Sequence, residues 1–98
     1  LDLSDNKITR LEQNSFYYLN NLNLLNLAFN LLSNLSKHLF SSLIKLNKLN
    51  LAHNYLYTLD PIIFQNLHYL IELDLSFNRL KILHNFMFCS NKLLFRLN

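Results

Sequence analysis

The chain has 98 residues and a formal net charge of +3, with 27 Leu, 16 Asn, one Pro, one Cys and no Gly. Its nine basic residues are dispersed instead of clustered, which excludes a basic nucleic-acid-binding tail. No uninterrupted apolar run reaches the ~18 residues that a membrane-spanning helix needs, so we expect no membrane insertion by this segment.

A repeat of 24 residues runs through the whole chain. Asparagines recur at this interval, each at the end of a similar hexapeptide: LDLSDN, LNLAFN, LNLAHN and LDLSFN. Seven apolar columns keep the same spacing, and of their 28 positions 27 are Leu, Ile or Phe, with Asn91 the exception. Such self-similarity predicts one domain, residues 1–98, in which each repeat is a structural unit. The four repeats are residues 1–24, 25–48, 49–72 and 73–96.

Each repeat begins with an LxL segment, which alternates apolar and polar residues as a β-strand does. In the second repeat, Leu25 and Leu27 are expected to point inward and Asn26 outward. Successive repeats run in the same direction, so we expect the strands to pair in parallel and to form one continuous concave sheet.

An asparagine follows each of these strands and is expected to turn the chain away from the sheet. Its amide can donate and accept hydrogen bonds with the backbone of its own and neighbouring turns. Since no Gly is available, Asn is also the residue that we expect at positions of positive φ. The predicted ladder of stacked amides consists of Asn6, Asn30, Asn54 and Asn78.

A phenylalanine column follows in the second half of each repeat, on the predicted convex side. We expect these rings to stack as a spine that fills the wider outer part of the coil. Pro61 stands beside this column on a returning loop, where a missing N–H is tolerated. Irregular turns or single 3₁₀ turns are therefore expected here. The spine consists of Phe16, Phe40, Phe64 and Phe88.

The complete unit, LxxLxLxxNxLxxLxxxxFxxLxxL, resembles the leucine-rich repeat family in its 24-residue form. Toll and Toll-like receptor ectodomains, chaoptin-like adhesion proteins, Slit and the small leucine-rich proteoglycans have this form. The resemblance implies an α/β solenoid, a curved right-handed coil with a parallel concave β-sheet and an irregular or 3₁₀ convex side. Because extracellular members carry cysteine-rich caps that are absent here, we expect the repeats to be an uncapped fragment of a longer array.

The concave face and its edge are the ligand surface that the resemblance implies. An aromatic line, Phe29, His53 and Phe77, stands where the strands end. Two interpretations of it stay open: anchors for a partner protein, or side chains that pack along the edge and cover the Asn ladder. His53 is either a titrating group or a neutral surface residue. The candidate partner-binding residues are Asp2, Asn26, Asn50, Asp74, Lys48, Glu72, Phe29, His53, Phe77, Tyr55 and Arg79.

Two further residues suggest specific hypotheses. Asn34 begins the sequon Asn34-Leu35-Ser36 and is a candidate N-glycosylation site if the protein is secreted. Cys89 is the only cysteine. It is either a free, partly buried thiol or half of a disulfide with a region outside this chain.

No catalytic motif occurs. Without Gly, neither a phosphate-binding loop nor a GxSxG elbow can form in its usual way, and one Cys with no HExxH argues against a metal site. We predict no enzyme activity, no cofactor, no metal and no nucleic-acid partner.

The resemblance implies a protein–protein recognition module. We expect it in the ectodomain of a cell-surface receptor or adhesion protein, or in a secreted protein. Its partner would be a protein ligand, with homodimerisation through the solenoid as a further option. An intracellular leucine-rich repeat scaffold or regulatory subunit is the alternative.

Overall fold

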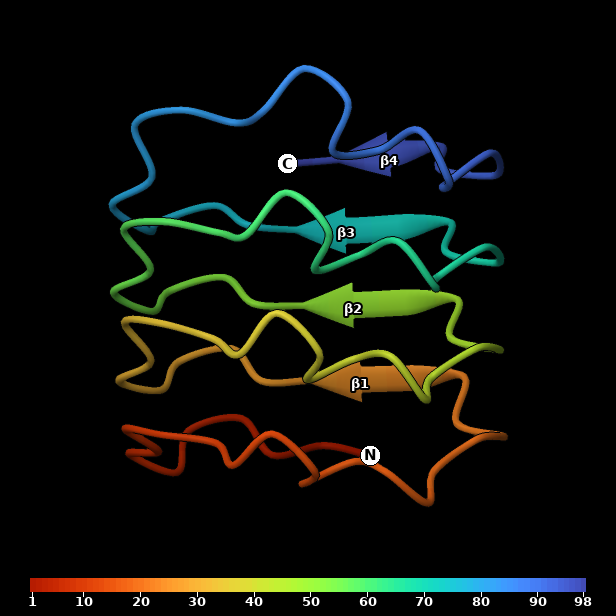
Figure 1. The fold of residues 1–98 in the computed structure, drawn as a ribbon. Coiled ribbons are helices and arrows are strands. Elements are labelled where there is room, and N and C mark those ends of the chain that lie inside the picture. Colours follow the sequence, from red (N-terminus) through yellow and green to blue (C-terminus); the bar gives the residue numbers. More distant parts are fainter.

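Four short parallel strands form the sheet of the molecule (Figure 1). The computed structural model describes all residues from 1 to 98. Strands that are consecutive in sequence are neighbours in the sheet, in the order β1-β2-β3-β4. The predicted solenoid with a parallel sheet is thereby confirmed. The strands are β1 (Leu24–Asn26), β2 (Lys48–Asn50), β3 (Glu72–Asp74) and β4 (Arg96–Leu97).

The pairing register reproduces the 24-residue repeat. Leu25 lies opposite Leu49, so each strand residue pairs with its equivalent in the next repeat. The strands begin one residue before the LxL segment and end before its second leucine. Hydrogen bonding between coils nevertheless continues past the strand, because the Leu27 N–H donates to the Asn50 carbonyl at 2.8 Å.

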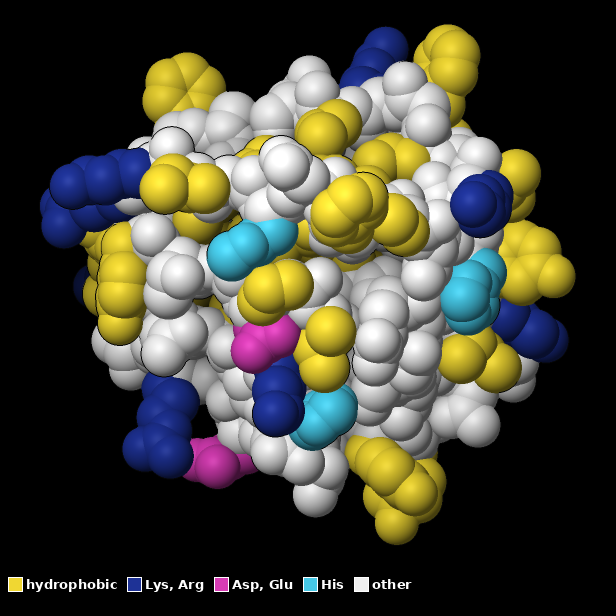
Figure 2. All heavy atoms as spheres, turned by 45° about the horizontal axis from the view of Figure 1, so that its top comes forward, with side chains coloured by type: hydrophobic (Ala, Val, Ile, Leu, Met, Phe, Trp, Pro, Cys, Tyr) yellow, Lys and Arg dark blue, Asp and Glu magenta, His cyan; other side chains and the backbone are white.

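The apolar columns form a continuous core of 20 buried residues. In the middle of the molecule the core leucines are shielded by a coil on each side. The first and last coils have one neighbour each, so Leu1, Leu19 and Leu83 of the same columns are exposed. Figure 2, in which the C-terminal coil comes forward, shows hydrophobic side chains on that surface. The first coil contributes no strand, and an isolated bridge between Asp2 and Asn26 joins it to β1.

The phenylalanine column forms a stack that crosses all four coils. Consecutive ring centroids lie 6.4, 6.2 and 5.9 Å apart, and neighbouring ring planes differ by only 10–12°. Phe16, Phe40 and Phe64 are buried, whereas Phe88 in the last coil is half-buried. The rings fill the space between the sheet and the convex backbone.

The convex side consists of tight turns. The same bond recurs in each coil, from an N–H to the carbonyl three residues earlier, as from Tyr17 to Asn14 and from Gln65 to Ile62. These turns agree with the expectation of irregular or single 3₁₀ turns. The structure has no helix with the length and apolar character required to span a membrane.

Positive φ falls on residues other than asparagine, so the expectation that Asn serves these positions is wrong. The column just before the Asn ladder carries the left-handed conformation, with φ of 56–58° at Asp5, Phe29, His53 and Phe77. Lys7 has φ of 56° as well. None of the ladder asparagines has positive φ. The residue before each of them makes the bend.

Lys7→Gly is expected to stabilise the fold by about 0.5 kcal/mol. A left-handed conformation costs a residue with a Cβ roughly 1–2 kcal/mol, and glycine removes this cost. Glycine also increases the conformational entropy of the unfolded chain, which lowers stability by about 0.4–1 kcal/mol. The strain relief therefore exceeds the entropy cost. Chemical denaturation measures the difference. Lys45→Gly is the control, because Lys45 is exposed and lacks positive φ, and it should destabilise by a similar amount. Destabilisation by both variants would contradict the strain argument.

Candidate functional site

The Asn ladder joins adjacent coils through side-chain hydrogen bonds. The Asn54 Oδ1 accepts from the Leu32 N–H of the preceding coil at 3.0 Å. Its Nδ2 donates to the Leu27 carbonyl of that coil at 3.0 Å. The same nitrogen donates to Leu51 and Ala52 in its own coil, at 3.1 and 3.3 Å. One amide thus closes its own turn and fastens it to the turn before.

The other ladder positions follow this pattern to different extents. Asn30 and Asn78 also donate to two carbonyls of their own coil and one of the preceding coil. Asn6, in the first coil, is exposed and donates only to the local carbonyls of Leu3 and Ser4. The ladder holds the end of each strand in place and so sets the shape of the sheet face.

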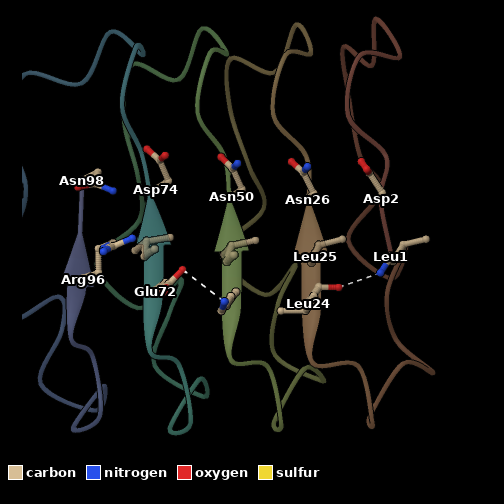
Figure 3. Close-up of a pocket in the computed structure, with 13 residues that line it drawn as sticks. Leu1, Asp2, Leu24, Leu25, Asn26, Asn50, Glu72, Asp74, Arg96 and Asn98 are labelled. Atoms are coloured by element: carbon tan, nitrogen blue, oxygen red, sulfur yellow. Dashed lines mark hydrogen bonds and ion pairs between the residues drawn. The ribbon is translucent and has the colours of Figure 1, made fainter.

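The middle column of the sheet face is also tied to the backbone. Each of Asp2, Asn26, Asn50 and Asp74 uses its Oδ1 to accept the N–H two residues further along, at 2.9–3.0 Å. These side chains form one row across the sheet (Figure 3). Their orientation is therefore fixed locally, while the second polar atom of each side chain makes no hydrogen bond within the chain. The row presents free acceptors at the two aspartates and free donors at the two asparagines.

The hydrogen bonds of Ser4 lower the pKa of Asp2 below its ordinary value of 3.8, the hydroxyl contributing most and the backbone N–H next. Both favour the ionised carboxylate. Since the folded-state pKa is depressed, the stabilisation is present above the unfolded-state pKa and is lost as pH falls through the folded-state value.

Ser4→Ala is expected to raise the pKa of Asp2 toward its ordinary value, because the hydroxyl donor at 2.6 Å is lost while the N–H donor stays. An NMR titration of the Asp2 carboxyl carbon measures the shift. Ser42→Ala, on the convex side, is the matched control and should leave this titration unchanged. An unchanged Asp2 titration in Ser4→Ala would contradict the assignment.

The strand column that precedes this middle row of Asp and Asn side chains carries alternating charges. Lys48, Glu72 and Arg96 stand opposite one another on β2, β3 and β4, and the Lys48 Nζ lies 3.8 Å from the Glu72 carboxylate. This pair is partly exposed, so it contributes little to stability. Together the two columns line a groove of about 440 Å³ over the sheet (Figure 3).

The aromatic line lies at the edge of this sheet face. The imidazole of His53 is stacked between Phe29 and Phe77, with centroid distances of 4.2 Å on both sides and planes within 10–11°. The rings are not buried over the ladder: Phe29 is 51% and Phe77 is 73% exposed. Beside them the Arg79 guanidinium lies 4.6 Å from the centre of the Tyr55 ring. The structure thus brings these five candidates together on one edge, apart from the polar groove.

Asn91, the exception in the apolar columns, is a structural residue whose role the repeat pattern did not predict. It is buried, and its Nδ2 donates to the carbonyls of Phe64 and Leu67 in the preceding coil, at 3.0 and 2.9 Å. It therefore links coils as the ladder asparagines do, on the opposite side of the core. Its Oδ1 is buried without a partner. The sign of this role in the sequence is an Asn in a core column that holds Leu in the other three repeats.

The two remaining candidates lie outside the sheet face. Cys89 is a free thiol, and it is exposed, not partly buried as expected, because its convex turn points the side chain outward. Asn34 is exposed, and its Oδ1 accepts from the Leu35 N–H at 2.9 Å, which leaves the Nδ2 atom accessible. No group of three or more His, Cys, Asp or Glu side chains is arranged to hold a metal ion.

Comparison with known proteins agrees with this geometry. A family model described as leucine rich repeat matches residues 1–56 and 44–98. No curated protein matches the chain. Among solved structures, the leucine-rich repeat domain of APL1B is 30% identical with a TM-score of 0.97, over 100% of this chain and 29% of that chain.

Two further structures are complexes with a bound partner. TLR13, in its complex with ssRNA13, is 35% identical with a TM-score of 0.87, over 93% of this chain and 13% of that chain. The Toll–Spatzle complex, described as a hub in Drosophila development and innate immunity, is 24% identical with a TM-score of 0.51. This match covers 99% of this chain and 19% of that chain. At this identity it shows the fold alone. The chain thus spans less than a third of each relative, and it belongs to the leucine-rich repeat family.

Proposed function

We propose that the chain is a protein-recognition segment in the ectodomain of a cell-surface receptor or adhesion protein, or in a secreted protein. Leucine-rich repeat proteins serve as interaction modules, receptor ectodomains among them. The observation that carries the proposal is the fixed row of Asp and Asn side chains over the sheet groove. Side chains already held in place lose little conformational freedom when a partner binds, which favours binding.

Photo-crosslinking tests the recognition role. A photoreactive amino acid is placed at Asn50 on the sheet face, at Phe77 on its edge, or at Gln65 on the convex side as the matched control. In cells that express the parent protein, we expect discrete crosslinks to a partner protein from Asn50 or Phe77 and none from Gln65. Crosslinks confined to Gln65, or absent from all three positions, would contradict recognition through this surface.

Two observations support the extracellular setting: the similarity to the solved structures above, and the accessible amide of Asn34 in its glycosylation sequon. The alternative, an intracellular scaffold or regulatory subunit, is compatible with the exposed thiol of Cys89, the one cysteine of the chain. Expression in mammalian cells distinguishes the two. A secreted or surface protein should carry a glycan at Asn34, seen as an electrophoretic shift that peptide-N-glycosidase and Ser36→Ala both remove. A cytosolic protein without this shift would support the scaffold.

Single-stranded RNA is a second candidate ligand, since TLR13 was solved with ssRNA13 and the edge of this chain is aromatic and basic. Bases bind such surfaces by stacking on open ring faces. Both faces of His53 are covered by Phe29 and Phe77, which leaves few faces for a base. We therefore retain a protein as the proposed ligand. Homodimerisation through the solenoid is a further proposal, and sedimentation velocity of the parent protein tests it.

A further inference from the structure

A cluster at the edge of the sheet differs in chemistry from the groove beside it. We call this cluster the lateral face, and it consists of Phe29, Leu31, His53, Tyr55, Phe77 and Arg79. Its residues occupy two columns, so neighbours along the chain are two positions apart and neighbours across coils are 24 positions apart. The stacked rings and the Arg79–Tyr55 contact join three coils into one surface.

The lateral face is held rigidly in a strained backbone conformation. Phe29, His53 and Phe77 all have φ of 56°, a conformation that costs bulky residues about 1–2 kcal/mol each. Stacking contributes roughly 0.5–1.5 kcal/mol per ring pair and offsets part of this cost. The rings are thereby ordered before any partner arrives. His53, with both faces covered, presents only its edge to solvent.

Exposed apolar side chains gather on this face. Phe29 and Phe77 are joined by Leu31 and Tyr55, which are also exposed. Contiguous apolar patches on the order of several hundred Å² mark interaction sites on soluble proteins. Tyr, Phe and Arg are enriched in protein interfaces, and Tyr and Arg are among the residues that dominate their binding energy.

The charge on this side is positive. Arg79 has no carboxylate partner, because the two ion pairs of the chain are Arg10–Glu12 and Lys48–Glu72. Lys7 lies in the same column as Arg79 and is likewise unpaired. Lys81 lies two residues after Arg79. In these two columns Asp5 is the one acidic side chain, against the two basic side chains Lys7 and Arg79. The sheet face, by contrast, carries both signs, with Asp2, Asp74 and Glu72 beside Lys48 and Arg96.

We propose that the lateral face docks an acidic segment of a partner protein that also carries aromatic or aliphatic side chains. Carboxylates of the segment pair with Arg79 and with the unpaired lysines, while its apolar side chains pack against Phe29, Phe77 and Leu31. Charge complementarity of this kind selects the partner and speeds association. The inference rests on the proposed recognition function and specifies its face and the chemistry of its partner.

Selection from a random peptide library displayed on phage tests the proposal with the intact chain as target. We expect the enriched peptides to be acidic and to contain Phe, Tyr or Leu. Fluorescence anisotropy with a labelled enriched peptide then compares variants whose folding is verified by circular dichroism. Arg79→Glu should weaken binding at least ~10-fold, and Phe77→Ala by a similar factor. Lys45→Glu makes the same charge change away from the lateral face and should leave the affinity unchanged.

The outcomes separate the two levels of inference. Enrichment of basic or uncharged peptides overturns the proposal. Acidic peptides that lose affinity in Lys48→Gln but not in Arg79→Glu bind at the sheet groove, which overturns the lateral face and leaves recognition standing. Binding of a uridine oligonucleotide through Arg79 and Phe77, without any acidic peptide, replaces the protein partner by a nucleic acid. A library without enrichment counts against both the docking proposal and the recognition function.

Discussion

Asn54→Ala is expected to lower the free energy of unfolding by about 3 kcal/mol. The Asn54 side chain is 5% exposed, and its amide makes four hydrogen bonds. Alanine leaves the buried Leu32 N–H without an acceptor, and a buried unsatisfied group costs about 1–3 kcal/mol. It also removes one donor from each of three carbonyls, although each of these keeps a second donor, namely the Nδ2 of Asn30, the Nδ2 of Asn78 or the Phe29 N–H. A domain of this size is stable by only about 5–15 kcal/mol. Chemical denaturation measures the loss, and the melting temperature should fall by at least ~10 °C.

Asn6→Ala is the matched control for this variant. Asn6 belongs to the same column, but it is exposed and its side chain donates only to carbonyls of its own coil. Water can replace those bonds, so the loss should stay below about 1 kcal/mol. Hydrogen exchange supplies a local readout, because the Leu32 amide loses its acceptor in Asn54→Ala and should exchange faster. Equal destabilisation by both variants would count against the ladder as the link between coils.

Phe64→Ala is expected to lower the free energy of unfolding by about 4 kcal/mol. Phe64 is fully buried, and its ring is stacked between Phe40 at 6.2 Å and Phe88 at 5.9 Å. Its removal opens a cavity between the sheet and the convex turns, and phenylalanine truncations of this kind cost about 3–5 kcal/mol. Urea denaturation should show a lower midpoint.

Phe86→Ala provides the comparison for the spine. Phe86 lies on the convex side of the last coil and is 81% exposed, so its truncation should change stability by no more than about 0.5 kcal/mol. Phe64→Leu retains most of the volume and should cost less than Phe64→Ala. A loss below 1 kcal/mol in Phe64→Ala would mean that the coils collapse around the gap and that the spine does not hold the two sides apart.

The solenoid was predictable from the sequence because the core residues recur with the period of the coil. Every coil must place apolar side chains at the same points of its circuit, so the LxL leucines and the phenylalanines recur every 24 residues. The pairing of Leu25 with Leu49 and of Leu49 with Leu73 follows directly from that period. The Asn ladder was predictable for the same reason, since one asparagine recurs at the same point of each coil and its amide can bind the backbone there.

The candidate site was predictable in its residues but not in its arrangement. The 24-residue spacing predicted that Phe29, His53 and Phe77 are neighbours. That spacing is equally compatible with rings that pack over the ladder and with rings that are exposed to solvent. The choice depends on backbone dihedrals and ring orientation, which no periodicity encodes. The same limit applied to the row through Asn26 and Asn50, whose local hydrogen bonds depend on the turn after each strand.

By itself, the sequence determined the repeat unit, the parallel stacking of coils and the identity of the core columns. These properties depend only on where apolar and amide side chains recur. Tertiary structure alone decided that the bend falls on the residue before each ladder asparagine, that His53 is enclosed between two phenyl rings, and that Asn91 binds the preceding coil. Each of these depends on contacts between coils, and such contacts exist only once residues 24 positions apart have been brought side by side.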